Sequence, residues 1–467
     1  MSCADASVVL IYRLQPPLPI RFSDFILPTT TLILTVACWW FTRLDGTSTD
    51  TVREDRLTFG VIAALVLLMS LMRFIDADYR LTASRPPDPI LVVITLALIT
   101  AIVLGASLLI RRMTTPDNQP RVQKRTLTVL MGIILVLFVL LKSAPLATEV
   151  SRFWRGQTGQ DTTLATFVDL NWLGFSYVAF RLIHTLRDRQ SGLLPSLTLR
   201  EYVTYVIFAP AYTAGPIDRA ERFTEDFRAL PEKVGLDGAR FSEGFTRIAI
   251  GAFKKFVIAD SLALGMALNP VNAAQVQSAP GMWLLLYGYA LRLYFDFGGY
   301  SDVAIGIGIL LGIKLPENFN RPYLRSNITV FWQSWHATLS AWARSYIFSP
   351  LSRSLLSRKP KPSSTLIVLV TQTATMVAIG MWHGISLNFL VWGIWHGVGL
   401  FVHKQWTDRT RKWYRGLADK PAQKRAWTLV GWFITFHFVV LGWVWFALPS
   451  LDQSLRVFGG LLGLGLK

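Results

Sequence analysis

The chain has 467 residues, of which 52% are hydrophobic and only 16% are charged. Soluble globular domains carry about 25% charged residues, so a soluble fold of this length would lack the charged shell that it needs. The aromatic content of 13% excludes a disordered chain, and two cysteines exclude a disulfide scaffold. A polytopic membrane protein is the class that remains, provided that the apolar residues form long blocks.

Long apolar blocks occur along the whole chain. A membrane-spanning helix needs about 20 mostly apolar residues, and only helices or closed barrels satisfy their backbone in lipid. Blocks of this kind lie near 26–43, 58–74, 90–110, 126–148, 163–185, 198–215, 242–268, 279–295, 364–382, 387–403 and 427–448. They do not alternate between polar and apolar residues as barrel strands do. We therefore predict an all-α fold, a polytopic membrane helix bundle of roughly eleven spans.

The net charge is +18, from 47 Lys and Arg against 29 Asp and Glu. In a soluble protein this excess would point to nucleic acid, but here the cations cluster in short loops between apolar blocks, where they set the membrane topology. The basic loops lie at 111–125, 187–200, 357–361 and 409–425. We predict that these loops are cytoplasmic and that nucleic acid is no partner of this chain.

Polar side chains distinguish three regions. Residues 1–160 are expected to be N-terminal transmembrane spans, 161–405 the core that carries the function, and 406–467 a basic loop with C-terminal spans. From 161 onward, ionisable groups stand inside apolar segments, where they are costly and usually functional. Examples are Asp169, His184, Lys254, Asp260, Arg292, Asp302 and His396.

Residues 294–345 carry the densest pattern. Pro316 and Pro322 interrupt any helix, and the residues between them include Glu317, Asn318, Asn320 and Arg321. Such a segment is a loop or re-entrant hairpin, which at membrane depth must be buried in protein or line a watery cavity. The following segment, 328–348, has an aromatic and a polar face at helical spacing, as in an interfacial helix or a helix that walls a polar cavity.

The sequence Trp-His-Gly occurs twice, at 382–384 and 395–397. His383 follows directly on the apolar block that precedes it, so it lies where that span ends or bends, with Asn388 nearby. A histidine there can accept a proton from a hydroxyl at neutral pH. From the residues alone, packing at the interface is an equally good interpretation of His383.

Three further features receive structural interpretations. The glycines of Gly306-x-Gly308-x-x-x-Gly312 favour close helix packing. Lys254 and Lys255 are typical of lysines that extend from a helix end toward the interface. No paired cysteines or clustered histidines indicate a metal site.

Six motifs together resemble the membrane-bound O-acyltransferase superfamily, and most of all its bacterial alginate O-acetylase-like branch. They are FDFGGYSDVAIGIGILLGIKLPENFNRPYL (295–324), FWQSWHATLSAW (331–342), MWHG (381–384), WGIWHG (392–397), AGPIDR (214–219) and GAFKKFVIAD (251–260). The resemblance covers about 163–405. It departs at Arg344-Ser345-Tyr346, where the family often has Arg-Asp-Tyr, and in the unmatched N- and C-terminal parts.

The resemblance implies the chemistry and the site. Members move an acyl group from a thioester to a hydroxyl; His383 would be the general base, and His336 would orient the reacting groups, relay the proton or stabilise the oxyanion. A tunnel or funnel through the bundle would narrow at His383. As tunnel or substrate-binding residues we predict Trp335, Trp382, Asp296, Tyr300, Asn318, Arg321, Ser340, Arg344 and Asn388. No permanently bound cofactor is expected, because acetyl-CoA or another acyl thioester is a donor substrate.

The expected function is that of a membrane O-acyltransferase in the bacterial plasma (inner) membrane. It would move an acyl group, in the first place acetyl, from a cytoplasmic thioester to a hydroxyl of a secreted or cell-surface polysaccharide, or to an extracytoplasmic partner of the SGNH type. One alternative is D-alanyl transfer to teichoic acid from a carrier-protein thioester. Another is a polytopic transporter or flippase, which explains the spans but not the histidine motifs.

Overall fold

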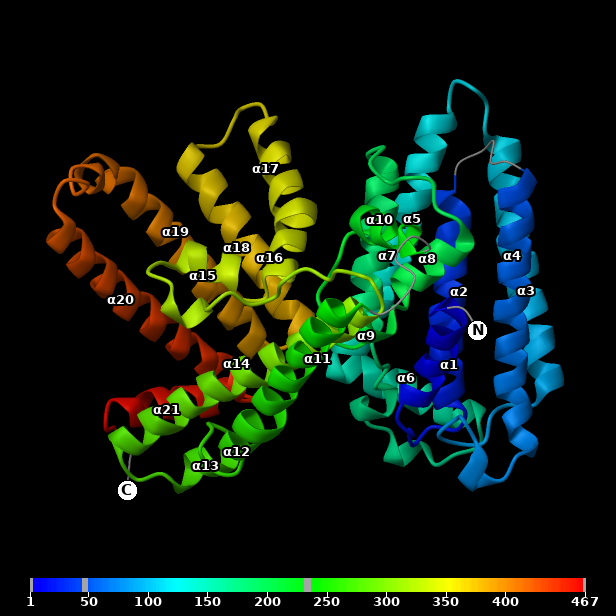
Figure 1. Ribbon diagram of the computed structural model, residues 1–467, viewed down its shortest axis with the longest axis horizontal. Coiled ribbons are helices and arrows are strands. Elements are labelled where there is room, and N and C mark those ends of the chain that lie inside the picture. The colour runs from blue at the N-terminus through cyan, green and yellow to red at the C-terminus, as the bar shows by residue number, and fades with distance from the viewer. Residues whose placement is uncertain (1–2, 44–48, 231–236, 465–467) are drawn as a thin grey trace. The chain divides into compact units, whose positions relative to one another are not determined.

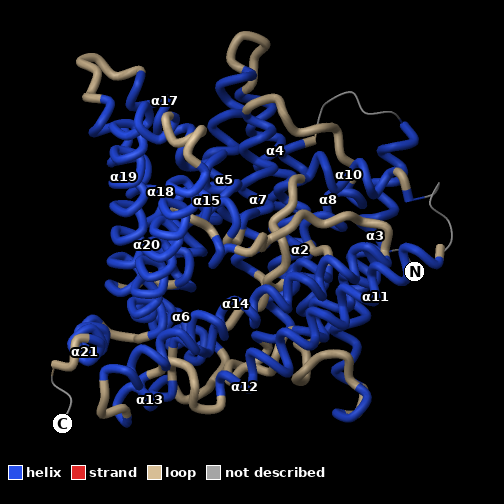
Figure 2. Tube along the Cα trace, turned by 60° about the vertical axis from the view of Figure 1, so that its left-hand side comes forward, coloured by secondary structure: helices blue, strands red, loops and turns tan. Residues whose placement is uncertain are grey.

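The computed structural model describes residues 3–43, 49–230 and 237–464, and in these ranges every regular element is helical (Figure 2). The predicted all-α class is therefore confirmed. The chain folds into two compact units, residues 1–235 and 236–467. The functional division at 160 and 405 does not coincide with these units, and it stays a prediction.

The first unit contains four helices that are long and apolar enough to cross a membrane: α2, α3, α4 and α5. Its elements are α1 (Cys3–Leu14), α2 (Ser23–Thr42), α3 (Thr49–Leu71), η1 (Met72–Phe74), η2 (Ala77–Tyr79), α4 (Pro89–Met113), α5 (Gln119–Lys142), α6 (Ala144–Gln157), η3 (Thr162–Leu164), η4 (Phe167–Leu170), α7 (Phe175–Gln190), α8 (Leu199–Val206), α9 (Ala209–Tyr212) and α10 (Ala220–Arg228). The residues of α4 and α5 are mostly exposed, as helices surrounded by lipid would be.

Three expected spans of this unit are divided, which corrects the prediction. The block at 126–148 is divided at Ser143, between α5 and α6. The block at 163–185 is split among η3, η4 and α7, and the block at 198–215 is split between α8 and α9. Pro210 explains the break between α8 and α9, because a proline in the first turn of α9 cannot continue the preceding helix. The buried Arg181 stabilises the break: its guanidinium donates to the carbonyl oxygens of Val206 and Ala211, at 2.7 Å each.

Asp169 connects η4 to α6 through a buried ion pair. Its carboxylate accepts hydrogen bonds from the Ser151 hydroxyl (2.7 Å), the Thr166 hydroxyl (2.7 Å) and the Arg155 guanidinium (2.8 Å). Burial by itself raises the pKa of the Asp169 carboxyl, but these hydrogen bonds outweigh burial and hold the pKa below its usual value. This polar residue therefore has a structural role.

The second unit begins with a helical hairpin and ends with a group of long helices. Its elements are α11 (Gly238–Ala252), the π-helical turn η6 (Phe253–Ala259), α12 (Asp260–Ala263), α13 (Pro270–Gln275), α14 (Ala279–Leu310), η7 (Pro322–Leu324), α15 (Ile328–Ser334), α16 (Ala337–Ala343), η8 (Arg344–Phe348), α17 (Ser349–Leu356), α18 (Ser364–His383), α19 (Leu387–Arg415), α20 (Pro421–Ala447) and α21 (Leu451–Leu461). Here α18 and α20 are long and apolar enough to span a membrane, which makes six such helices in the described part of the chain. The total of roughly eleven spans stays a prediction.

The helices α11 and α14 pack antiparallel at very short range (Figure 1). A Cβ on Gly251 would lie 2.6 Å from the Gly299 carbonyl oxygen, and one on Gly306 would lie 2.7 Å from the Gly244 carbonyl oxygen. The predicted role of Gly306 in close helix packing is confirmed. The contact fixes the register of the two helices that carry the charged residues described below.

The direction of the last helices places both basic loops of this unit at one end. The helix α18 starts just after the 357–361 loop and ends at His383, and α19 returns from there to the basic segment 409–425. The prediction of a loop over all of that segment is wrong, because α19 continues to Arg415 and α20 starts at Pro421. In Figure 1 these two loops lie at the upper side of the unit. At the other end, the Trp283 indole N–H near the start of α14 donates to the Leu461 carbonyl at the end of α21 (3.1 Å), so α14 starts beside α21.

Candidate active site

His336 lies at a break between two helices. The predicted single helix over 328–348 is wrong in this respect: α15 ends at Ser334, α16 begins at Ala337, and His336 between them has φ 42°. The left-handed region is uncommon for a residue other than glycine and costs on the order of 1 kcal/mol. The break persists because the loop before α15 replaces lost helix bonds.

That loop bonds to the chain on both sides of His336. The Asn320 backbone N–H donates to the Ser334 carbonyl (3.0 Å), and the Ala337 N–H donates to the Asn318 carbonyl (2.9 Å). A helix bends sharply where groups from another segment interrupt its backbone hydrogen bonds in this way. The segment expected to be a loop or re-entrant hairpin is thus a loop around residues 318–320, held against protein.

The Asn318 side chain connects three elements. It is fully buried, its amide N–H donates to the Ser301 hydroxyl on α14 (3.2 Å), and its amide oxygen accepts from the Thr338 hydroxyl on α16 (2.8 Å). Thr338 is two residues after His336. Asn318 was predicted to touch substrate, and the bonds that its amide makes in this structure fix the turn that carries His336.

The imidazole of His336 is 3% exposed and lies among aromatic rings. Phe297 of α14 meets it edge-on with ring centroids 4.7 Å apart, and Trp382 of α18 lies at 5.9 Å. Among the described residues, none is a hydrogen-bond partner of the buried Nε2 atom. Because a buried polar atom without a partner is costly, this nitrogen is suited to a group that the site receives.

His383 is the last residue of α18 and is only half buried. Its ring contacts Trp382 and Phe446 with centroids 4.4 and 4.7 Å apart, and Phe389 and Trp392 at 5.8 and 5.9 Å. Aromatic rings on several sides exclude bulk water, while the partial exposure of the imidazole leaves it accessible to a solute. Such surroundings suit a group that exchanges a proton with a bound hydroxyl.

The two motif histidines share a neighbour. They stand 47 residues apart in the chain, yet the His336 ring reaches Trp382, which directly precedes His383. Trp382 was itself predicted as a tunnel residue, and it lies between the two imidazoles.

The structure gives two other predicted site residues strong packing contacts. Trp335 is buried among aromatic rings, with Trp443 at 5.0 Å and Phe319 at 5.1 Å between centroids. The buried Asn388 donates its amide N–H groups to the Leu448 carbonyl (2.7 Å) and the Ser454 hydroxyl (3.0 Å). These bonds attach the start of α19 to the end of α20 and to α21.

The remaining predicted residues lie on α14 and α16 and at the start of η8. Asp296 forms an ion pair with Lys255 at 2.8 Å, and Tyr300 is one helical turn further along α14. The Ser340 hydroxyl makes a long 3.5 Å contact to the Trp335 carbonyl, and Arg344 is exposed.

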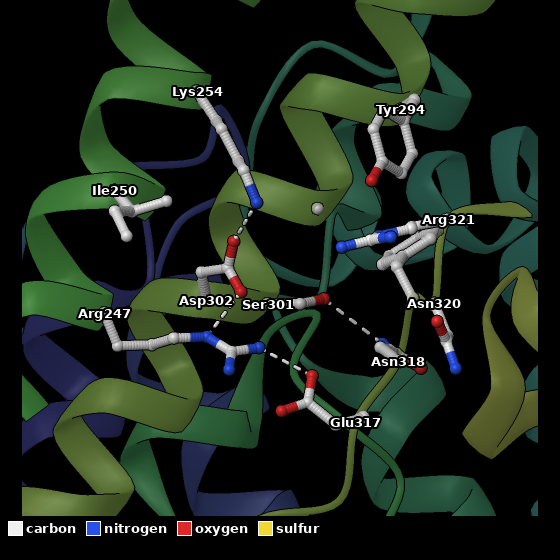
Figure 3. Close-up of a pocket in the computed structure, with 12 residues that line it drawn as sticks. Arg247, Ile250, Lys254, Tyr294, Ser301, Asp302, Glu317, Asn318, Asn320 and Arg321 are labelled. Atoms are coloured by element: carbon white, nitrogen blue, oxygen red, sulfur yellow. Dashed lines mark hydrogen bonds and ion pairs between the residues drawn. The ribbon is translucent and has the colours of Figure 1, made fainter. Parts of the chain in front are cut away.

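A polar pocket of about 490 Å³, which we call the α11–α14 pocket, lies beside the His336 turn (Figure 3). Its walls come from α11, η6, α14 and the loop after α14. Twelve residues line it: Arg247, Ile250, Lys254, Tyr294, Gly298, Ser301, Asp302, Glu317, Asn318, Phe319, Asn320 and Arg321. Asn318 and Arg321 were predicted site residues. Asp296 and Tyr300 stand two residues from Gly298, about 200° around the helix, and therefore on the opposite face.

Charged side chains dominate the walls of this pocket. Asp302 pairs with Arg247 and with Lys254 at 2.6 Å each, and Arg247 also pairs with Glu317 at 2.6 Å. Lys254 and Lys255 were predicted to extend toward the interface, but both form ion pairs, Lys255 with Asp260 (2.6 Å) and Asp296. Sequence reasoning missed Arg247 as a site residue; its seven-residue spacing from Lys254 is a signal that could have found it. In the described part of the chain, no three ligating side chains form a metal cluster.

Comparison with known proteins agrees with the motifs. The model of the membrane-bound O-acyltransferase (MBOAT) family matches residues 119–444, which is more than half of the chain and starts before the region where the motifs begin. The chain is 34% identical over 287 residues to a teichoic acid D-alanyltransferase of Streptococcus thermophilus, which covers 60% of this chain and 68% of the relative.

The names of two further relatives indicate that they act on other glycans. The chain is 34% identical over 294 residues to a probable alginate O-acetylase of Pseudomonas fluorescens, covering 63% of this chain and 54% of the relative. It is 35% identical over 264 residues to a peptidoglycan O-acetyltransferase of Helicobacter pylori, covering 56% and 47%. The chain thus spans about half the length of these two curated relatives.

Proposed function

Because the chain belongs to the membrane-bound O-acyltransferase family, we propose that it moves an acyl group, in the first place acetyl, from a cytoplasmic thioester to a hydroxyl of a cell-surface polysaccharide or of an extracytoplasmic SGNH-type partner enzyme. The family and the six apolar helices establish the coarser statement, a multi-pass membrane O-acyltransferase. Acetyl-CoA is the donor that we propose first. Family membership favours acyl transfer over the transporter alternative.

The convergence of two motif histidines on Trp382 carries this proposal. In the proposed reaction, the His383 imidazole accepts the proton of the acceptor hydroxyl while its oxygen attacks the thioester carbonyl. The tetrahedral intermediate collapses, the carbon–sulfur bond breaks, and the proton passes from His383 to the departing thiolate. General-base assistance of this kind contributes about 10²–10⁴ in rate.

His336 takes the second role in the proposed reaction. Its buried Nε2 has no protein partner among the described residues, so a neutral ring protonated there can donate to the oxyanion that forms on the thioester carbonyl. The aromatic rings around both histidines keep water from the thioester, which favours transfer to the acceptor over hydrolysis.

D-alanyl transfer from a carrier-protein thioester is the second candidate function. It is supported by the D-alanyltransferase of Streptococcus thermophilus, of which the chain covers 68%, a larger share than of the two O-acetyltransferases. The same two histidines would serve both reactions, because the attack on the thioester carbonyl is the same step.

The test uses membranes that contain the chain, an acetyl-labelled CoA and, separately, a D-alanyl-labelled carrier protein. We expect label to pass from acetyl-CoA to a glycan acceptor, and His383→Gln to reduce this transfer by about 10²-fold or more, because glutamine cannot accept the proton. The matched control is His437→Gln. His437 is distant in the chain from both motif histidines, and it bonds to the Tyr287 hydroxyl (2.9 Å).

Both variants should accumulate in the membrane as the unsubstituted chain does. Transfer from the D-alanyl carrier alone would select the second candidate function. Full transfer by His383→Gln with either donor would contradict the role given to His383.

A further inference from the structure

The α11–α14 pocket holds more positive than negative charge. Its walls carry three cationic side chains, Arg247, Lys254 and Arg321, and two acidic ones, Asp302 and Glu317. The first two cations already pair with the two carboxylates. Among the described residues, the exposed Arg321 side chain forms neither an ion pair nor a side-chain hydrogen bond, so its charge is available to a ligand.

Arg321 is also directed at the pocket. Its backbone is left-handed, with φ 45°, and Figure 3 shows its guanidinium extending from the loop toward the wall that carries Lys254 and Asp302. The Tyr294 side chain and the Ser301 hydroxyl face the same space (Figure 3). A guanidinium with neighbouring cations and hydroxyl groups is the typical arrangement for binding a phosphate group.

The position of the pocket fits a ligand of the reaction site. Phe297, next to the pocket residue Gly298 on α14, meets the His336 ring at 4.7 Å between centroids. The α14 residues of the pocket, Tyr294, Gly298, Ser301 and Asp302, lie from the middle of that helix onward, and the other pocket residues come from α11, η6 and the loop after α14. The pocket also adjoins the reaction site, because Asn318 lines it and bonds to Thr338 beside His336.

We propose that the α11–α14 pocket binds a phosphate group of the thioester donor, with Arg321 as its principal contact. This inference rests on the proposed acyl transfer and adds to it the site and the residue that would hold the phosphate of the donor. The same phosphate chemistry is present in CoA and in the phosphopantetheine arm of a carrier protein.

The test measures binding without turnover. The full chain carrying His383→Ala is purified in detergent, and its affinity is measured for CoA, for 4′-phosphopantetheine and for pantetheine, which lacks phosphate. We expect CoA to bind at least about tenfold more tightly than pantetheine, and this advantage to shrink as ionic strength rises. Equal affinity for 4′-phosphopantetheine and CoA would identify the arm's own phosphate as the contact, whereas tighter binding of CoA would identify the phosphates of its nucleotide.

Substitutions at three residues should change the affinity for CoA differently. Arg321→Gln should weaken CoA binding by about 10- to 100-fold and leave pantetheine binding unchanged, since a charge-assisted contact is lost. Arg321→Lys should lose less, because the charge remains but the bidentate geometry does not. Glu317→Gln should tighten CoA binding about two- to fivefold, because it removes a negative charge that is half exposed. Lys314→Gln is the matched control. It removes the same charge from the same loop, but Lys314 does not line the pocket.

Pantetheine binding as tightly as CoA, or Lys314→Gln weakening CoA binding as much as Arg321→Gln does, would overturn the inference. Thermal unfolding of each variant shows whether it is folded, and Arg321→Lys keeps the test informative if Arg321→Gln is not. Because His383→Ala does not turn over, the outcomes separate. Predicted CoA binding without acyl transfer from either donor by the unsubstituted chain sinks the proposed function alone, whereas full CoA affinity in Arg321→Gln sinks the pocket alone.

Discussion

At the scale of single residues, the proposed chemistry depends on how the protein positions His336. Its backbone occupies a left-handed conformation that the neighbouring helices do not impose. The bonds from Asn318 to Ala337 and Thr338, on the C-terminal side of the turn, stabilise it. We therefore interpret Asn318 as a positioning residue that acts through His336, rather than as a group that touches substrate.

Removing the Asn318 amide tests this interpretation. Asn318→Ala keeps the backbone bond to Ala337 but loses the bonds to Ser301 and Thr338. We expect kcat to fall by about 10- to 100-fold, because small misplacements of a catalytic group have effects of that size, while KM for the donor changes little. The pH profile of kcat should also shift, since the surroundings of His336 change. Steady-state kinetics in membranes measure both.

Gln333→Ala is the control for this prediction. It lies three residues before His336 on α15 and is exposed, so it should leave both kcat and the pH profile unchanged. A fall in the amount of folded Asn318→Ala protein with unchanged kcat per folded molecule would mean that Asn318 serves stability alone.

At the scale of elements, the glycine contacts between α11 and α14 set the frame of the pocket. Gly251→Ala should lower the thermal unfolding temperature, because its Cβ would lie 2.6 Å from a backbone oxygen that cannot move without shifting α14. Gly105→Ala on α4 is the matched control: nothing lies within 4 Å of its Cβ. Alanine is favoured over glycine inside a helix by about 0.5–1 kcal/mol, so this variant should be equally or more stable. Unfolding in detergent, followed by temperature, compares the two, and equal behaviour would contradict the close contact.

The elements also show how far the sequence could be interpreted. Apolar blocks predicted the long helices α2–α5, α18 and α20, because length and composition alone decide which helices can cross a membrane. Helical spacing over 328–348 did not predict the break at His336, since periodicity carries no information about a loop distant in the chain that bonds to that backbone. Pro210, by contrast, was a visible signal for the break after α8.

Residues of the candidate site could be predicted where they belong to a sequence motif. His383, His336 and Trp382 came from motif resemblance, and the contact of His336 with Trp382 emerged only from the fold. Arg247 was not predicted because an arginine on an amphipathic helix looks like an ordinary solvated residue until Asp302 and Glu317 are seen beside it.

At the scale of the whole molecule, the proposed reaction connects a cytoplasmic donor with an acceptor on the other side of the membrane. In α18 the basic loop and His383 are separated by 20 helical residues, about 30 Å along the axis. If the basic loops are cytoplasmic, the general base lies far from the compartment that supplies the thioester. The donor must therefore extend into the protein, which is consistent with a phosphate bound in the α11–α14 pocket and a reactive end near His336.

The most direct test of the central claim is mass analysis of the surface glycan from cells that express the unsubstituted chain, His383→Ala, or none. We expect the glycan to lose its acyl groups both without the chain and with His383→Ala, although that variant is present in the membrane in normal amount. A glycan that remains fully acylated in cells with His383→Ala as their sole copy would contradict the claim.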